Sequence, residues 1–549
     1  MTDSSPAAMV LAAHRRSLAG RSLASLFAAD PERFALLSLA WNHWLADFSK
    51  QHVTAETIGL LLAYARERNL SEWISALLSG EKVNLSEERP ALHSALRQGT
   101  DLPVRVGGVD VMPAIRNTQT RMRSLSQQLR GGLRLGATGR PIRHVVSLGT
   151  GDFDLGPRLA CEALASPRAA GSGGVDVAFV SNVDPEHLTR TLAGLDPATT
   201  AFIITSRSFT TLESMINAHS AREWLARALG GASLSTHFIA VTGNAEAARA
   251  FGVASADVLP MWDWVGARFS LWSAAGLPIA IRCGWESFAE MLAGAARMDA
   301  HFRETPFETN LPVLLALIDF WNARYMRCEQ RVVVPYAHAL ALLPAYLQQL
   351  ELVSNGKSVA RDGSPLDPPT AAALWGGTGT DGQYAFSQWL HQGTHAVPVE
   401  FIVPVRAAHP LGDQQAFLVA SALGQAQALM TGRSSDALRP ELAAKGLAPA
   451  PVNAQAAHRA CPGNRPSTVL LIPEIDPRRL GELLALYEHR VFVEGVMFGV
   501  DSFDQWSSEL GGTATEPLFA ALRDGTAPDR ADASTRALLE HARALLPRR

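Results

Sequence analysis

Short runs of apolar residues, many of them β-branched, recur along the chain, and each is followed by a turn signal and a helical pattern. Apolar runs that alternate with helices are typical of parallel strands with helices on both faces of the sheet. The runs fall into two series, which predicts two doubly wound sheets. The first series comprises residues 144–148, 175–180, 201–205 and 237–242, and the second comprises residues 331–335, 399–405 and 468–472.

The remaining segments have patterns of their own. Before about residue 110 the periodicity is helical throughout, and residues 56–67 and 71–80 are amphipathic examples. Residues 432–465 mix Pro, Ala, Ser and charged residues, which predicts an excursion on the surface. Residues 517–549 are rich in Ala, Arg and Leu and predict a terminal helix.

The length and composition indicate a globular protein with two domains. The chain has 549 residues, of which 47% are hydrophobic and 18% charged, and this is more than one hydrophobic core usually organises. The formal net charge of -3 gives no general field that attracts nucleic acid or an anionic membrane. The cysteines Cys161, Cys283, Cys328 and Cys461 form no closely spaced pair, so we expect reduced thiols, no disulfide framework and no metal site.

No segment has the pattern of a secretory signal or a membrane span. The apolar stretch 7–13 precedes His14, Arg15 and Arg16, whereas a signal peptide places its basic residues first. The longest apolar run, at 311–318, is far shorter than the roughly 20 residues that a span needs. The expectation is a cytoplasmic protein that does not enter a membrane.

The most informative local segment, residues 202–213, has the pattern of a strand, a hydroxyl-rich turn and a helix start. At such a junction the unpaired N–H groups and the positive end of the helix dipole favour an anion. The hydroxyl groups of Ser206, Ser208 and Thr211 are expected to converge there, beside Arg207. This arrangement suits a phosphomonoester.

Two local patterns leave alternatives open. Thr210 and Glu213 have the spacing of a capping box, which would make the same turn a capped helix without a ligand. The glycine cluster at 149–157 is similar to a dinucleotide-binding loop, but its third glycine is misplaced and Pro157 opens the next helix. Close approach of the backbone to a ligand and a merely tight turn explain that cluster equally well.

Eight strings carry a resemblance that extends from about residue 30 to residue 512. They are residues 148–157, Phe179-Val-Ser-Asn-Val-Asp184, residues 206–213, residues 263–270, Ser354-Asn-Gly-Lys357, His391-Gln-Gly-Thr394, Gly463-Asn-Arg-Pro-Ser467 and residues 502–511. In order and spacing these strings resemble the phosphoglucose isomerase family.

The resemblance implies an α/β fold of two sugar-isomerase (SIS) type αβα sandwiches with parallel sheets. Combined with the pattern above, it predicts a helical N-terminal region at 1–110 that packs on the large domain and a small αβα domain at 111–280 that carries the phosphate-binding turn. A large αβα domain at 281–512 and a C-terminal helical arm at 513–549 complete the expected organisation.

The resemblance also implies an activity and an assembly. The family interconverts glucose 6-phosphate and fructose 6-phosphate by opening the ring and moving a proton between C2 and C1 through a cis-enediol. It uses no metal and no cofactor. It forms a homodimer in which each active site borrows residues from the partner subunit.

The family's phosphate-binding turn resembles Ser206, Arg207, Ser208 and Thr211, with Arg207 where the family commonly has lysine. The positive charge is retained, although a planar guanidinium donates differently from an ammonium. Gly151 belongs to the glycine-rich loop that is expected to approach the ligand beside this turn.

The other family roles concern the sugar and its proton transfers. Arg268 resembles the arginine that stabilises the developing enediolate by a preorganised charge. Gln349 and Gln505 resemble the glutamines that contact the substrate. His391 resembles the ring-opening histidine supplied across the dimer, and Glu213 lies where its carboxylate partner is expected.

Several family positions carry replacements. Val353 stands where the family has the base that moves the C1/C2 proton, and a general base typically contributes about 10²–10⁴-fold. Gly512 stands where the family has its C-terminal catalytic lysine, and Phe153 where it has a serine that contacts the sugar phosphate. Asp152 replaces the preceding glycine and is expected to repel a dianion. Three further replacements are Ala267 for a glycine, Gly377 for a common glutamate and Tyr384 for a common histidine.

Three hypotheses follow. The first is a glucose-6-phosphate isomerase with weak or absent conventional activity, in which Glu351, Asp152 or His391 replaces the missing base. Glu351 points the same way as Val353 only in a regular strand, not in a helix. The second is a non-catalytic pseudoenzyme that binds a sugar phosphate or regulates a partner. The third is an enzyme for another anionic ligand, with Asp152 and Tyr384 as new pocket groups.

Overall fold

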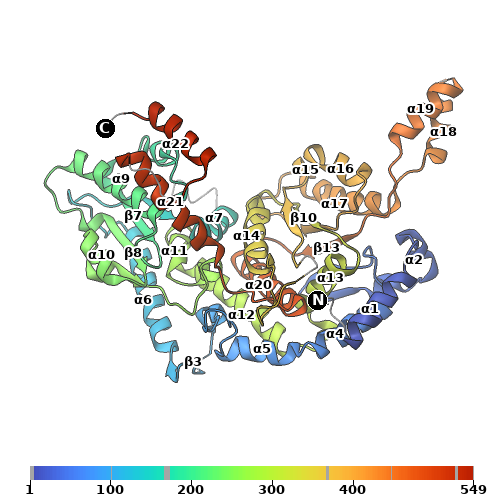
Figure 1. The fold of residues 1–549 in the computed structure, drawn as a ribbon, viewed down its shortest axis with the longest axis horizontal. Helices are drawn as coiled ribbons and strands as arrows, with labels where there is room; N and C mark the ends of the chain where they lie inside the picture. Colours follow the sequence, from blue (N-terminus) through green and yellow to red (C-terminus); the bar gives the residue numbers. More distant parts are fainter. Residues whose placement is uncertain are drawn as a thin grey trace. The chain divides into compact units, whose positions relative to one another are not determined.

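The structure is a computed structural model that describes residues 5–100, 102–165, 174–366, 370–446, 448–525 and 530–547. The chain divides into two compact units, Met1–Ser502 and Phe503–Arg549. Figure 1 shows the elements of both units along the coloured chain. Both predicted sheets belong to the first unit.

The larger sheet of the described chain has six strands in the order β1-β2-β13-β12-β10-β11. The strands β10 to β13 are parallel, as predicted, and an antiparallel hairpin extends the sheet beyond β13. The three strands predicted for this half of the chain are confirmed, whereas the four-residue β11 was not predicted. The bounds are β1 (Ser38–Trp41), β2 (Trp44–Asp47), β10 (Gln330–Pro335), β11 (Ala373–Gly376), β12 (Val399–Pro404) and β13 (Ser467–Ile472).

The hairpin of β1 and β2 shows that the prediction of a wholly helical segment before residue 110 is wrong. Asn42 and His43 connect the strands with φ angles of 46° and 66°. Two successive positive φ angles characterise the tight turn that matches the twist of a hairpin, and Asn favours that turn. Trp44 is buried and its indole N–H donates to Glu482 (3.1 Å). Burial of this aromatic residue against the sheet outweighs the local helical pattern.

The rest of the N-terminal region is mainly helical. The predicted helices at 56–67 and 71–80 are confirmed as α4 (Ala55–Glu67) and α5 (Leu70–Ser79). At the start of α4, Thr54 and Thr57 form a capping box in which each side chain satisfies the other residue's N–H. The other elements here are α1 (Pro6–Ser17), α2 (Leu23–Ala29), α3 (Arg33–Leu36), β3 (Arg105–Val106) and β4 (Val109–Asp110).

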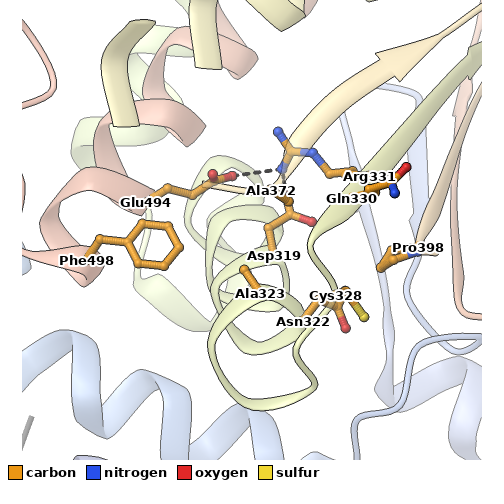
Figure 2. Close-up of a pocket in the computed structure, with 10 residues that line it drawn as sticks. All are labelled: Asp319, Asn322, Ala323, Cys328, Gln330, Arg331, Ala372, Pro398, Glu494 and Phe498. Carbon is orange, nitrogen blue, oxygen red and sulfur yellow. Dashed lines mark hydrogen bonds and ion pairs between the residues drawn. The ribbon is translucent and has the colours of Figure 1, made fainter. Parts of the chain in front are cut away.

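Helix α20 (Pro477–Phe498) lies next to the six-stranded sheet, where Arg490 bonds to Glu400 of β12, and it is buried along almost its whole length. Its charged side chains are therefore paired inside the protein. Arg490 contacts Asp319 and Glu400, and Glu494 accepts a hydrogen bond from Arg331 (3.0 Å). A cavity of about 10 Å³, room for about one water molecule, lies beside these groups (Figure 2).

Nine further α-helices of the described chain lie between residues 277 and 459 of the same unit. Within the predicted surface excursion, α18 and α19 pack on each other through a small apolar cluster, and most of their other side chains are exposed. Among the helices of the described ranges, none combines the length and the apolar character needed to cross a membrane. The bounds are α11 (Leu277–Cys283), α12 (Trp285–Glu304), α13 (Leu311–Phe320), α14 (Leu343–Asn355), α15 (Asp381–Ala385), α16 (Ser387–Gln392), α17 (Gln414–Thr431), α18 (Ser435–Ala443) and α19 (Pro449–Arg459).

The second sheet of the described chain has five parallel strands in the order β6-β5-β7-β8-β9. The four strands predicted for this half of the chain are confirmed, and only the three-residue β9 was missed. The strands are β5 (His144–Gly149), β6 (Asp176–Val180), β7 (Thr200–Thr205), β8 (Phe238–Thr242) and β9 (Val258–Pro260). The helices of this domain are α6 (Met112–Arg130), α7 (Leu155–Ala163), α8 (Pro185–Leu192), α9 (Leu212–Leu229) and α10 (Ala245–Phe251).

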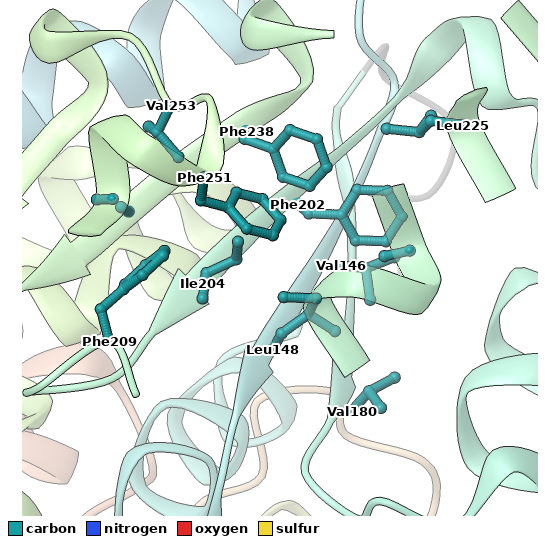
Figure 3. Close-up of a cluster of buried hydrophobic side chains, with 14 of the residues drawn as sticks. Val146, Leu148, Val180, Phe202, Ile204, Phe209, Leu225, Phe238, Phe251 and Val253 are labelled. Carbon is teal, nitrogen blue, oxygen red and sulfur yellow. The ribbon is translucent and has the colours of Figure 1, made fainter. Parts of the chain in front are cut away.

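An aromatic cluster closes one face of this sheet (Figure 3). Phe202 and Phe238 lie on neighbouring strands, with ring centroids 5.7 Å apart, and Leu225 of α9 belongs to the same cluster. Val145 and Ile203, one position along from residues of the cluster, are also buried. Because both faces are covered, these strands read in the sequence as continuous apolar runs without alternation.

The second unit, considered by itself, contains α21 (Ser507–Asp524) and α22 (Ala533–Leu545). The predicted terminal segment is thus two helices instead of one, and the boundary predicted between residues 512 and 513 falls within α21. Gly525 ends α21 in the left-handed conformation, with φ of 80°. The other predicted domain boundaries, at 110 and 280, stay predictions.

Glycines allow α12 and α20 to approach each other closely. A Cβ on Gly481 would overlap the carbonyl oxygen of Met291, and a Cβ on Gly294 would overlap that of Arg478. We expect Gly481→Ala to lower the free energy of unfolding by about 1–3 kcal/mol, because overpacking forces the helices apart. This loss should exceed the gain in helix propensity from Gly to Ala, which is about 1 kcal/mol.

Gly59→Ala on α4 is the matched control, because a Cβ there would meet no atom within 4 Å. This substitution should raise the free energy of unfolding by about 0.5–1 kcal/mol. Urea unfolding curves of the wild type and the two variants measure both effects. A Gly481→Ala protein at least as stable as the wild type would contradict the close packing of these helices.

Candidate functional site

The strand order of the five-stranded sheet creates a switch point between β5 and β7, because the chain moves from β5 to β6 on one side and then to β7 on the other. In open α/β sheets, ligands bind in the crevice outside the carboxyl ends of the strands at such a point. The glycine-rich turn follows β5 and the hydroxyl-rich turn follows β7. Gly149 pairs in register with Thr205, and a Cβ on Gly149 would lie 3.2 Å from the Cβ of Phe153. The structure therefore brings both predicted turns together.

The hydroxyl-rich turn is held by its own side chains. The hydroxyl groups of Ser206 and Thr211 share a hydrogen bond of 3.1 Å. Ser208 accepts hydrogen bonds from the N–H (3.2 Å) and the hydroxyl (2.7 Å) of Thr210. Phe209 has a φ of 56° and buries its ring in the aromatic cluster, which fixes the turn from inside the domain. The three predicted hydroxyl groups thus gather at the start of α9.

The alternative of a capping box at this turn is not formed. The N-cap of α9 is Thr211, and its side chain accepts no hydrogen bond from the first turn of the helix. The Thr210 hydroxyl donates to Ser208 instead, and Glu213 is exposed. The first N–H groups of a helix have no partner within it, so an uncapped α9 favours an anion in front of the turn.

Arg207 is fixed next to the hydroxyl groups. Its guanidinium donates to the carbonyl oxygen of Val265 (2.6 Å). Burial lowers the pKa of Arg207, and the neighbouring Arg89 lowers it further, while Asp152 is among the carboxylates that oppose this change. A desolvated and positioned cation of this kind is a strong donor to an anion.

Asp152 contacts a residue that the resemblance assigns to the substrate. Its carboxylate accepts a hydrogen bond of 2.5 Å from the side-chain amide of Gln349. Gly151 has a φ of 41°, and a Cβ there would lie 3.4 Å from the same amide nitrogen. Gln349 therefore donates to a protein carboxylate in this structure, and a phosphate dianion would meet a negative charge beside the turn.

Arg268 lies next to the helix that carries the replaced base. It belongs to the 3-10 helix η7 (Ala267–Trp272) and is buried. Its Nε donates to the hydroxyl of Ser354 (2.8 Å), and its terminal nitrogen donates to the carbonyl oxygen of Ser502 (2.6 Å). Ser354 directly follows Val353 on α14. Arg268 thus contacts the residue that follows position 353, and position 353 itself has no titratable group.

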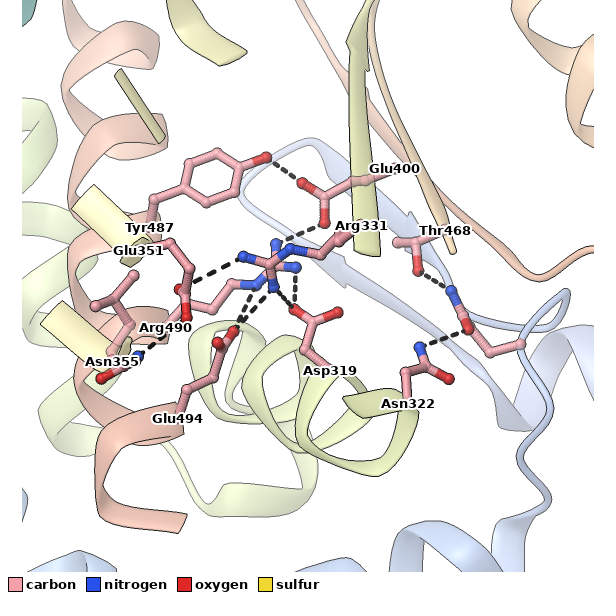
Figure 4. Close-up of polar contacts among 12 residues, drawn as sticks. Asp319, Asn322, Arg331, Glu351, Asn355, Glu400, Thr468, Tyr487, Arg490 and Glu494 are labelled. Atoms are coloured by element: carbon pink, nitrogen blue, oxygen red, sulfur yellow. Dashed lines mark hydrogen bonds and ion pairs between the residues drawn. The ribbon is translucent and has the colours of Figure 1, made fainter. Parts of the chain in front are cut away.

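Glu351 belongs to a different cluster, shown in Figure 4. Because α14 remains helical through Asn355, the side chains at 351 and 353 diverge by about 200° around the helix axis. The Glu351 carboxylate accepts hydrogen bonds from Asn355 (3.2 Å) and Arg331 (3.5 Å). Its place in this buried network removes Glu351 from the face of Val353.

His391 and Glu213 are not joined within the single chain. In α16, the Nε2 of His391 lies 2.9 Å from the side-chain oxygen of Gln425 on α17. In the part of the chain that the structure describes, no hydrogen bond or ion pair links His391 to Glu213 or to the hydroxyl-rich turn. Tyr384 is 91% exposed. The expected roles of His391 and Glu213 therefore depend on a second subunit and stay predictions.

The predicted residues Gln505 and Gly512 belong to the second unit. Gly512 is exposed on α21, and a Cβ there would meet no atom within 4 Å. A longer side chain at this position is therefore sterically allowed. Across both units, the described residues include no cluster of three or more His, Cys, Asp or Glu side chains placed to hold a metal ion.

Sequence reasoning missed Asp154, a buried carboxyl group at the N-cap of α7. One of its oxygens has no hydrogen-bond partner in the described chain. Burial raises the pKa of this group to about 6, although Arg158 and Ser181 oppose the shift. The signal in the sequence is its place within the glycine cluster, directly before the start of α7. The charge pattern there does not reveal that the carboxyl group is buried.

The comparisons with known proteins agree with one another. The family model of phosphoglucose isomerase matches residues 47–539. Glucose-6-phosphate isomerase of Ectopseudomonas mendocina is 44% identical over 540 residues, covering 98% of this chain and 97% of that protein. Glucose-6-phosphate isomerase 2 of Chromobacterium violaceum is 43% identical over 530 residues, covering 96% of each.

Solved structures extend the similarity to the whole fold. A glucose-6-phosphate isomerase from Chlamydia trachomatis matches with a TM-score of 0.84 at 27% sequence identity, and the match covers 99% of both chains. A hypothetical protein from Thermus thermophilus has a similar fold, with a TM-score of 0.60 at 21% identity over 83% of this chain and 96% of that chain.

The buried carboxyl of Asp154 predicts a dependence of stability on pH. The ordinary pKa of this group is 3.8 and its folded value is about 6. Between these values the folded state binds more protons, so its stability is greatest below the lower value and falls as pH rises through the upper one. Asp154→Asn cannot ionise, so its stability relative to the wild type should rise by at most about 3 kcal/mol from pH 4 to pH 7.

Urea unfolding of the wild type and Asp154→Asn at several pH values between 4 and 7 measures this difference. Arg158→Gln removes the nearby cation and keeps the acid. In this variant the free energy of unfolding should fall more steeply with rising pH than in the wild type, because Arg158 opposes the rise of the Asp154 pKa. A difference between Asp154→Asn and the wild type that is independent of pH would show that Asp154 titrates normally.

Proposed function

Because this chain belongs to the phosphoglucose isomerase family, we propose that it binds hexose 6-phosphates at the switch point of the small domain and interconverts glucose 6-phosphate and fructose 6-phosphate weakly or not at all. The observation that carries the second half of this proposal is the side chain of Val353 on α14. It stands at the family's proton-transferring position, next to the buried Arg268–Ser354 contact.

The binding half is supported by the geometry of the turn after β7. Hydroxyl groups at Ser206, Ser208 and Thr211 gather at the uncapped start of an 18-residue helix, with Arg207 beside them. A phosphate group would receive charge-assisted hydrogen bonds from these donors, which are stronger than those between neutral groups. The relatives named glucose-6-phosphate isomerase make a sugar phosphate the natural ligand for this set.

The proposal of weak or absent isomerase activity rests on the residues that replace the family's acid and base. A proton on carbon needs a base close to it, and Val353 cannot supply one. Glu351 is held by Arg331 and Asn355 on another face of α14. Gly512 supplies no donor for ring opening.

The electrostatics around the phosphate are also altered. Asp152 adds a carboxylate whose charge acts on Arg207 and which bonds to Gln349. Phe153 places a hydrocarbon ring where the family has a donor. Both changes weaken the affinity for a dianion without removing the site.

A non-catalytic role as a sugar-phosphate-binding or partner-regulating protein is the second candidate. The observation in its favour is the combination of an intact phosphate turn with the loss of titratable groups at Val353 and Gly512. In either role we propose a homodimer, since His391 in one chain has no described link to the turn.

We expect glucose 6-phosphate to bind with its phosphate at the hydroxyl-rich turn. Ser208→Ala should weaken binding roughly tenfold, because a hydrogen bond to a charged group is lost. Asp152→Asn should strengthen binding several-fold, because it keeps the acceptor for Gln349 and removes the repelling charge. Isothermal titration calorimetry with glucose 6-phosphate and inorganic phosphate measures both effects.

Ser233→Ala is the matched control, since Ser233 is an exposed serine beyond α9 that bonds only to Ser235 in the described chain. Its affinity should equal that of the wild type. Equal affinities in the wild type, Ser208→Ala and Asp152→Asn would mean that the sugar phosphate does not bind at this turn.

We expect isomerase activity to rise when the missing groups are restored. Val353→Glu supplies a carboxylate beside Arg268, and Gly512→Lys supplies a donor for ring opening. Since these residues serve successive steps, their effects should be non-additive. The double variant should exceed the wild type at least roughly tenfold, because a general base alone contributes about 10²–10⁴-fold.

Two assays separate the steps: conversion of glucose 6-phosphate to fructose 6-phosphate, and exchange of deuterium at C2. Val353→Gln, of similar size but without a base, is the control and should not raise exchange. Wild-type turnover in the ordinary range of about 1–10³ per second would overturn the interpretation of Val353 and direct attention to Asp152 and His391.

A further inference from the structure

A pocket of about 840 Å³ lies in the first unit, and none of its lining residues belongs to the site at the switch point. It is formed where the end of α1 and the start of α2 meet the segment after α16 and the turn before β13. Its volume falls in the range of pockets that hold small organic molecules. The cavity of Figure 2, which shares Asn322 and Cys328 with it, has room for only about one water molecule.

The charges that line this pocket are all basic. Arg15, Arg21 and Arg465 line it together with His52, whose pKa is lowered by burial, and no Asp or Glu is among the lining residues of the described chain. Arg15 and Arg21 are exposed and make no ion pair within the described chain. The small neighbouring cavity differs in this respect, because its Arg331 is paired with carboxylates. The large pocket therefore holds positive charge without a compensating group.

Arg465 is the buried part of this site. Its residue is only 7% exposed, and its Nε has no hydrogen-bond partner in the described chain. One terminal nitrogen donates to the carbonyl oxygen of Gly393, and no carboxylate of the described residues contacts it. Burial lowers the pKa of Arg465. Burying an arginine without a carboxylate partner costs free energy of folding unless a bound anion pairs with its charge.

Neutral donors lie next to these cations. Asn464 has a φ of 55°, and its side-chain oxygen accepts hydrogen bonds from His52 (2.8 Å) and from the N–H of Leu23 (2.7 Å). With the oxygen engaged, the amide nitrogen of Asn464 is left to donate. Thr394, a residue with a hydroxyl group, lines the same pocket.

We propose that this pocket binds an organic polyanion, a small molecule with two or more carboxylate or phosphate groups. Three arginines set apart around one cavity require more than one anionic group to neutralise them. The volume exceeds what a single inorganic ion fills. Arg465 receives one anionic group at the buried end, and Arg15 and Arg21 receive another at the rim.

Titration calorimetry with citrate and with magnesium-free ATP, at constant ionic strength, tests the proposal and separates the carboxylate from the phosphate source. The side chains of Arg15 and Arg21 at the rim are exposed, so the double variant Arg15→Gln/Arg21→Gln should fold normally. The double variant should raise the Kd roughly threefold to tenfold, the range expected when exposed ion pairs are lost. Arg465→Met should raise it by at least roughly tenfold.

Arg16→Gln is the matched control. Arg16 is an exposed neighbour of Arg15 in the last turn of α1 but does not line the pocket. Its Kd should equal that of the wild type. Acetate, which carries one charge, should bind much more weakly than citrate. Ser208→Ala should leave the citrate Kd unchanged, so failure of the proposed sugar-phosphate site and failure of this site are distinguishable.

Binding of either citrate or ATP that weakens in the rim variant supports the proposal and identifies the source of the anionic groups. No binding of either probe, or the same Kd in the wild type, the rim variant and Arg465→Met, overturns it. Analytical ultracentrifugation tests whether a second copy of the chain occupies the pocket instead. A rim variant that shifts the monomer–dimer equilibrium without changing anion binding would assign the pocket to that second copy and overturn the proposal.

Discussion

The region around the six-stranded sheet depends on the pairing of charges that α20 carries into the interior of the first unit. Arg490 and Glu494 lie on a helix that is buried on nearly all sides, and they are matched by Asp319, Glu400 and Arg331. Removing one member of such a cluster leaves an uncompensated charge, which typically costs about 3–5 kcal/mol. The strands and helices that supply the partners are thereby fixed against α20.

This constraint reaches the site through α14. Glu351 projects from α14 into the charge cluster, while Ser354 bonds to Arg268. Both contacts fix the rotation of the helix about its axis, and with it the direction of Val353. The same rotation that completes the cluster therefore turns Val353, about 200° from Glu351 around the helix axis, away from it. Glu351 cannot turn toward the face of Val353 without leaving the cluster.

The pattern of the sequence predicted both parallel sheets because their strands are apolar on both faces, and it predicted the turn at 206–211 because hydroxyl groups cluster there. It missed β1 and β2, since their partner β13 lies far away in the sequence and local periodicity cannot reveal such pairing. It also missed the Asp152–Gln349 contact and the burial of Asp154. Both depend on which segments the fold brings together, and neither has a signature in neighbouring residues.

The hairpin of β1 and β2 has a consequence for biosynthesis. Its pairing partner is β13, where Asp47 is matched with Val469, so this edge of the large sheet cannot form until nearly the whole chain has left the ribosome. The strands of the small sheet lie between His144 and Pro260 and depend on no later segment for their pairing. Since contacts between distant segments form slowly and domains generally fold as units during synthesis, the emerging chain holds the N-terminal hairpin unpaired while the small domain folds. During that interval the edge of β2 that later pairs with β13 is open, and an open strand edge can pair with other chains.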